Sequence, residues 1–158
     1  MSTVADKPKP ARSLRRGVSF GLVAGLLAGL AWFLIVIGTH STQAYLIPLF
    51  GVVVAYGVHV GMRRPGSQAA FLAIAITAVT LIIGMFYVER HLLVKLFSDN
   101  GDALHIPLAP YLDWVAAVVR HAMGKSLSMP VYSVLALVAA GWFGHQGFDT
   151  HDPRLRRP

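Results

Sequence analysis

The 158-residue chain contains no cysteine. This absence excludes disulfides, thiolate metal sites and cysteine nucleophiles, and it leaves the redox compartment undetermined. Charged residues are also scarce, at 13% of the chain, whereas 55% of the residues are hydrophobic. A soluble domain of this size would need more charged surface, so the composition indicates an integral membrane protein.

Sequence patterns of catalytic sites are missing as well. No apolar segment holds two carboxylates, and the chain has no Gly-x-Ser-x-Gly elbow, no HExxH motif and no phosphate-binding loop. Catalysis inside a membrane would normally need an ionisable group at depth. We therefore expect a protein that is not an enzyme and that has no catalytic residues, metal or cofactor.

What the chain does contain is apolar segments long enough to cross a bilayer, whose hydrocarbon core is about 30 Å thick. Four of them are predicted, over residues 17–38, 44–62, 68–88 and 129–148. The first has 22 residues without a charge, and this length favours an uncleaved span over a signal peptide. The predicted fold class is an all-α membrane protein, with four transmembrane helices in one bundle over residues 17–148.

Two polar tails flank this domain. Residues 1–16 are rich in Lys, Arg and Pro, cannot bury a core, and are predicted to be a disordered cytoplasmic tail. Residues 149–158 are predicted to be a second cytoplasmic tail. Ten of the 14 Lys and Arg residues lie in these tails and in the link between the second and third spans. This bias predicts a bacterial-type inner membrane protein with both termini in the cytoplasm.

The net charge of +7 has the same explanation. The basic residues stand next to apolar segments, as orientation signals do, so the bilayer is the expected partner and nucleic acid is not. The residues expected at the membrane surface are Arg12, Arg15, Arg16, Arg63, Arg64, Arg154, Arg156 and Arg157.

One amphipathic segment separates the third and fourth spans. The apolar pattern of the third span continues beyond residue 88 to Phe97, and residues 98–102 then predict a break. Residues 110–123 carry apolar side chains on one helical face and charged ones on the other. This pattern predicts a helix that lies in the outer membrane interface. A short re-entrant hairpin is the alternative.

Small residues recur at helical spacing in all four spans, and such residues let helices approach closely in lipid. In the first span they are glycines at every fourth position. In the third they form a stripe that continues to Tyr87 and His91 and that we expect to face the bundle interior. The predicted packing residues are Gly17, Gly21, Gly25, Gly29, Gly51, Ala55, Gly57, Gly61, Ala73, Thr77, Thr80, Gly84, Ala136, Ala140 and Gly144.

Histidines are numerous for this length, and four of them are predicted to lie at two depths. His59 and His145 fall near the cytoplasmic side, and His40 and His91 near the outer side. Paired imidazoles at two levels of a helical bundle could hold a b-type haem, relay protons or bind a metal. Span ends are also where a histidine needs no ligand, so we expect no cofactor there.

Residues 17–91 resemble uncharacterised small bacterial inner-membrane proteins with four spans. The resemblance lies in a glycine-repeat span with Trp32, in the run from Phe50 to Gly57, in a basic glycine turn and in the run from Gly84 to Tyr87. It implies a fold and a location but no activity. The leading hypothesis is a non-enzymatic accessory or assembly subunit, which uses its glycine rows to bind itself or a larger complex. A small-solute or ion permease is the alternative, and a haem- or quinone-linked redox carrier is the third.

Overall fold

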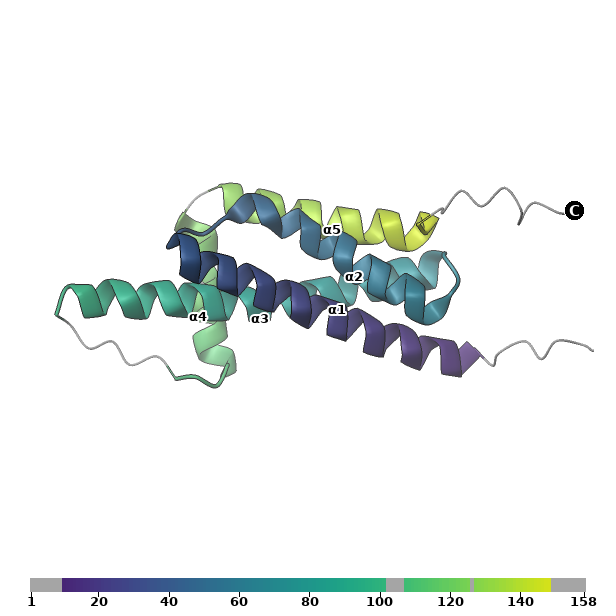
Figure 1. Ribbon diagram of the computed structural model, residues 1–158, viewed down its shortest axis with the longest axis horizontal. Coiled ribbons are helices and arrows are strands. Elements are labelled where there is room, and N and C mark those ends of the chain that lie inside the picture. The colour runs from purple at the N-terminus through teal and green to yellow at the C-terminus, as the bar shows by residue number, and fades with distance from the viewer. Residues whose placement is uncertain (1–9, 102–106, 126, 149–158) are drawn as a thin grey trace, which may run out of the picture.

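The computed structural model describes residues 10–101, 107–125 and 127–148, and every regular element in them is a helix (Figure 1). The all-helical class predicted from the sequence is therefore confirmed for this part of the chain. The helices are α1 (Pro10–Thr39), the short 3-10 helix η1 (Ala44–Leu46), α2 (Ile47–Met62), α3 (Ser67–Asp99), α4 (Leu112–Lys125) and α5 (Ser128–Gln146).

Three stretches of the described chain are long and apolar enough to cross a membrane, namely Ser13–Thr39, Ala44–Met62 and Ser67–Asp99. Helices α4 and α5 pass the same test only as a pair, and this pair is bent by 107°. The count is thus three, or up to four if the bent pair forms one span. Such a chain is compatible with the predicted multi-pass membrane protein.

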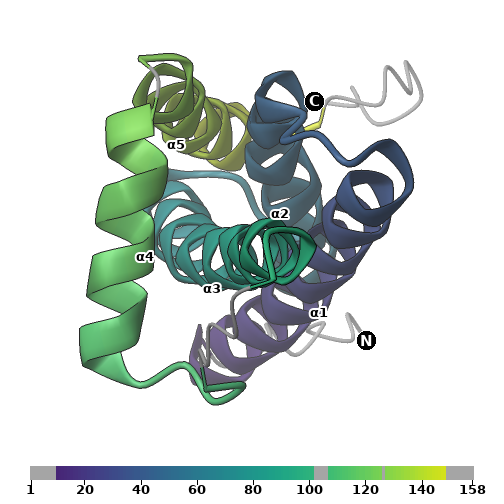
Figure 2. The same ribbon diagram turned by 90° about the vertical axis from the view of Figure 1, so that its left-hand side faces the viewer.

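Four of the helices lie lengthwise beside one another, and α4 lies across one end of them (Figure 1). Seen from that end, α3 stands in the middle (Figure 2), and it contacts α1, α2, α4 and α5. The start of α1 and the end of α5 lie together at the opposite end of the molecule. The structure thus places α3 between the other long helices (Figure 2).

Helix α1 begins earlier than the sequence predicts. Residues 10–16 were expected to belong to a disordered tail, but they form the first turns of α1. Pro10 is tolerated at a helix start because its missing N–H would have no partner there. Arg16 is already in contact, because its carbonyl lies against Gly61 of α2. The rest of that predicted tail, residues 1–9, and the predicted tail 149–158 lie outside the described residues.

Helix α3 is much longer than a bilayer requires. Its 33 residues correspond to about 50 Å at 1.5 Å per residue. Neither Glu89 nor Arg90 interrupts it, and it ends at Asp99, inside the segment where the sequence predicts a break. Arg90 Nε donates a hydrogen bond to the Pro107 carbonyl (3.2 Å), which ties the segment before α4 back to α3.

The apolar stripe of α4 packs largely against protein. Val118 and Ala122 are buried, and Val119 and Met123 pack against the main hydrophobic cluster. Leu112, at the start of the helix, is 84% exposed. The sequence pattern thus marks the correct helical face, although much of that face covers α3. Placement of α4 in the membrane interface stays a prediction.

The turn between α2 and α3 depends on one glycine. Gly66 has φ of 141° and ψ of −176°, a backbone conformation that essentially only glycine adopts. Its N–H donates to the Gly144 carbonyl of α5 (3.3 Å). Arg63, which ends α2, adopts the left-handed conformation at φ 55°. The basic turn predicted from the sequence therefore also connects to α5.

Two hydrophobic clusters fill the interior. One contains large side chains, including Trp32, Phe50 and Met85. The Trp32 and Phe50 rings meet edge to face, with their centroids 5.7 Å apart. The other is built mainly from smaller side chains such as Ala55, Ala73 and Ala140. The first cluster also contains one small residue, Ala136.

Candidate functional site

The closest approach between α1 and α2 is at two glycines of α2. A Cβ atom added at Gly57 would lie 2.7 Å from the Phe20 carbonyl oxygen, and one added at Gly61 would lie 2.6 Å from the Arg16 carbonyl oxygen. Backbone atoms cannot move aside as a flexible side chain can. Both positions predicted for helix packing therefore hold two backbones in contact.

The glycine row of α1 faces helices of the same chain. Gly17 lies against Met62 of α2, Gly21 lies between Val58 and Ile76, and Gly25 lies against Thr80 of α3. These three glycines thus pack against helices of their own chain. In this packing Gly17, Gly21 and Gly25 are buried, so a partner would have to bind elsewhere, whereas Gly29 is only half-buried.

Helix α5 is held by small residues on α2 and α3. Gly51 lies directly against the Ala136 carbonyl, and a Cβ atom there would also lie 3.0 Å from the Ala140 nitrogen. A Cβ atom at Gly144 would lie 2.8 Å from the Cα atom of Ala70 in α3. Ala55, predicted for the same role, is fully buried.

The stripe predicted on α3 faces the interior over most of its length. Ala73, Thr77, Thr80 and Gly84 are buried, whereas Tyr87 is half-buried. The Thr80 hydroxyl donates to the Ile76 carbonyl (2.8 Å), as expected of a threonine in an apolar helix. Thr77 Oγ1 is buried and has no hydrogen-bond partner within the described part of the chain.

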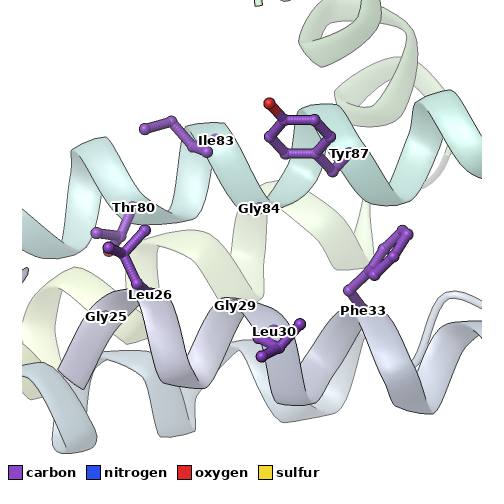
Figure 3. Close-up of a pocket in the computed structure, with 9 residues that line it drawn as sticks. All are labelled: Gly25, Leu26, Gly29, Leu30, Phe33, Thr80, Ile83, Gly84 and Tyr87. Carbon is purple, nitrogen blue, oxygen red and sulfur yellow. The ribbon is translucent and has the colours of Figure 1, made fainter. Parts of the chain in front are cut away.

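A groove with a volume of about 250 Å³ opens between α1 and α3. Its lining residues are Gly25, Leu26, Gly29, Leu30, Phe33, Thr80, Ile83, Gly84 and Tyr87. Figure 3 shows Thr80 and Leu26 at one end of this groove and Phe33 and Tyr87 at the other. We refer to it as the α1–α3 groove.

The α1–α3 groove exists because the two helices separate beyond Gly25. At Gly25 a Cβ atom would lie within 3.0 Å of the Thr80 side chain. One turn later, the nearest atoms to a Cβ added at Gly29 belong to Phe50, 3.8 Å away. A Cβ atom added at Gly84 would lie 3.7 Å from the Trp32 ring. The two aromatic rings of the core thus stand where α1 and α3 would otherwise meet.

The four histidines have separate surroundings. His91 meets the Phe33 ring edge to face, with centroids 5.7 Å apart, and His40 Nδ1 lies 2.9 Å from Lys95 Nζ. His59 contacts Phe148 with its ring, and His145 is exposed. Among the described residues, no group of three His, Cys, Asp or Glu side chains is placed to hold a metal ion.

The predicted surface arginines are only partly described. Arg15, Arg16, Arg63 and Arg64 are exposed, the first two on α1 and the last two in the turn before α3. Arg12 lies in the first turns of α1. Arg154, Arg156 and Arg157 lie outside the described residues.

Three features were missed by sequence reasoning. Glu89, one residue beyond the predicted third span, is only 1% exposed, and the buried face of α3 that includes Met85 continues one turn further to reach it. Trp32 Nε1 is buried, and none of the residues that the structure describes forms a hydrogen bond with it. The pairing of Lys95 with His40 joins residues 55 positions apart, and no local pattern marks it.

Comparison with protein-family models, with curated proteins and with solved structures finds no match to this chain. Its likeness to small bacterial inner-membrane proteins therefore stays a prediction, and proposals about its function depend on its own residues.

Proposed function

We propose that the protein is a non-enzymatic accessory or assembly subunit of a bacterial-type inner membrane. The observation that carries this proposal is the way in which the helices pack in the interior. Small residues bring the backbones of α1, α2, α3 and α5 into contact, and large apolar side chains fill the remaining space. Such an interior supports a rigid membrane module, because a reaction or a transport path would need polar space between the helices.

In this proposal the chain crosses the membrane four times, with α5 as the fourth crossing and both termini in the cytoplasm. Two observations support this topology. The start of α1 and the end of α5 lie at the same end of the molecule (Figure 1). Ten of the 14 Lys and Arg residues belong to the segments that would then be cytoplasmic.

The surface for a partner does not include Gly17, Gly21 and Gly25 of α1, which are buried inside the molecule. The outward sides of the helices remain available. On α1 they include Leu27, which is 61% exposed, and on α5 they include Val138, which is 60% exposed. A complex would have to form on faces of this kind.

Photo-crosslinking in native membranes tests the proposal. A photoreactive amino acid is placed at Leu27 or at Val138, with Val58, which is fully buried, as the matched control. We expect at least one exposed position to give a discrete crosslinked product in membranes, and the buried position to give none. A chain that gives no product at any position and that migrates as a lone monomer after gentle extraction would refute the accessory role.

Two buried polar atoms favour a permease as the second candidate. Thr77 Oγ1 and Trp32 Nε1 have no hydrogen-bond partner among the described residues, and a polar solute could supply one. In proteoliposomes, Thr77→Val should then abolish solute flux, whereas Val79→Ala on the exposed side of α3 should preserve it. Equal flux in both variants, or no flux in the unmodified chain, would exclude this candidate.

A further inference from the structure

Beyond the α1–α3 groove, α3 carries His91 and Lys95, whose side chains contain nitrogen. Tyr87, His91 and Lys95 follow each other at intervals of four residues and therefore lie on successive turns of one face of α3. Tyr87 lines the groove, and so does Phe33, whose ring contacts His91. The groove lining ends at Phe33 and Tyr87, and His91 and Lys95 follow on the same face of α3, about one and two turns beyond it.

Lys95 is placed to hold an anion at this end. An ammonium group has three N–H donors and no acceptor, so in the 2.9 Å contact His40 Nδ1 accepts and Lys95 donates. Donors remain on Lys95 for another acceptor. Within the described residues Lys95 forms no ion pair, and this includes Asp99, the acid one turn further along α3.

The spacing along α3 matches the depth of one leaflet. From Thr80 to His91 the helix rises about 16 Å at 1.5 Å per residue. Half of a hydrocarbon core about 30 Å thick is about 15 Å. Lys95 lies about 6 Å further along, which is the depth of the polar headgroups. The groove lining on α3 runs from Thr80 to Tyr87, about 10 Å, so the groove has room for the end of an acyl chain. Lys95 lies about 22 Å from Thr80 along the helix, where the headgroup phosphate of such a lipid would be.

We propose that the α1–α3 groove binds one phospholipid, with an acyl chain against Gly29 and Gly84 and the headgroup phosphate on Lys95. Leu26 and Leu30, 57% and 54% exposed, form the outer wall and leave the groove open sideways to lipid. His40 contacts the Lys95 ammonium about two turns of α3 beyond Tyr87, where the groove lining ends. The proposal requires only that the chain lies in a membrane, and it is independent of the accessory role.

Native mass spectrometry of the full chain tests the headgroup contact. The chain is released from nanodiscs that contain equal amounts of phosphatidylglycerol and phosphatidylcholine. We expect one retained lipid, preferentially phosphatidylglycerol. Lys95→Gln should weaken that preference about fivefold, the change that corresponds to about 1 kcal/mol for one cation near a headgroup. Arg120→Gln, which removes an exposed cation from α4, should preserve it.

A second pair of variants tests the groove itself. Leu30→Trp places a larger side chain in the groove and should reduce retention of both lipids. Leu27→Trp, one turn earlier on the exposed side of α1 and outside the groove, should leave retention unchanged. An equal preference for phosphatidylglycerol in Lys95→Gln and Arg120→Gln would overturn the proposal. Equal lipid retention in Leu30→Trp and Leu27→Trp would overturn it as well. Release of the chain as dimers that Leu30→Trp separates would also overturn it, because the groove would then hold a second copy.

Discussion

The contact between Gly51 and α5 makes a quantitative prediction about stability. In Gly51→Ala the added methyl group would lie against the Ala136 carbonyl, 2.9 Å from its carbon and 3.0 Å from the Ala140 nitrogen. These are backbone atoms of another helix, so α2 and α5 would have to separate. Overpacking of this kind destabilises by about 1–3 kcal/mol.

Gly29→Ala is the matched control. Its methyl group would meet only the Phe50 ring, at 3.8 Å, which is ordinary van der Waals contact. Both substitutions occur inside helices and share the gain of about 0.5–1 kcal/mol that alanine has over glycine there. The difference in unfolding free energy between the two variants therefore isolates the contact of α2 with α5.

Unfolding in mixed micelles, with increasing sodium dodecyl sulfate and detection by far-UV circular dichroism, measures this difference. We expect Gly51→Ala to unfold at a lower mole fraction of the denaturing detergent than Gly29→Ala. The free energy of unfolding derived from the two transitions should differ by about 1–3 kcal/mol. Coincident transitions of the two variants would refute the backbone contact between α2 and α5.

Three further predictions follow from single positions. Thr77→Val should stabilise the protein by about 1 kcal/mol in the same unfolding assay, because it removes a buried hydroxyl that has no partner among the described residues. Thr80→Val should bring no gain, because the Thr80 hydroxyl donates to the Ile76 carbonyl and this hydrogen bond is lost. Gly66→Ala should destabilise by about 1–3 kcal/mol through its φ of 141° alone, since no atom lies within 4 Å of the added Cβ; an unchanged transition would contradict this. In the cysteine-free chain, Ser41→Cys should react with an impermeant thiol reagent in intact cells and Ser67→Cys only after permeabilisation, and labelling of both from one side would contradict four crossings.

The helices could be predicted closely because local chemistry determines where they begin and end. Apolar runs bounded by charged or glycine-containing turns placed the end of α2, the start of α3 and both ends of α5 to within two residues. Helix α2 begins three residues after the predicted span does, behind η1, and α3 continues eleven residues beyond the predicted span. The start of α1 was missed because a basic, proline-containing segment has no apolar periodicity of its own. It forms a helix here as an extension of the apolar run that follows.

The contacts between helices could be predicted only in part. Spacing showed which faces of α1 and α3 carry small residues, but it could not show that Gly25 meets Thr80 of the same chain. The α1–α3 groove depends on where Trp32 and Phe50 lie relative to Gly84, and therefore on three helices at once. The burial of Glu89 was missed because an acid next to Arg90 resembles the polar end of a span.

The central position of α3 has a mechanical consequence. This helix is continuous over about 50 Å, reaches past the end of α1, and contacts the four other long helices (Figures 1 and 2). A pull or twist applied to its protruding end would be transmitted along an unbroken rod to the whole assembly. The protruding end is therefore the point at which a load from outside would reach every helix together.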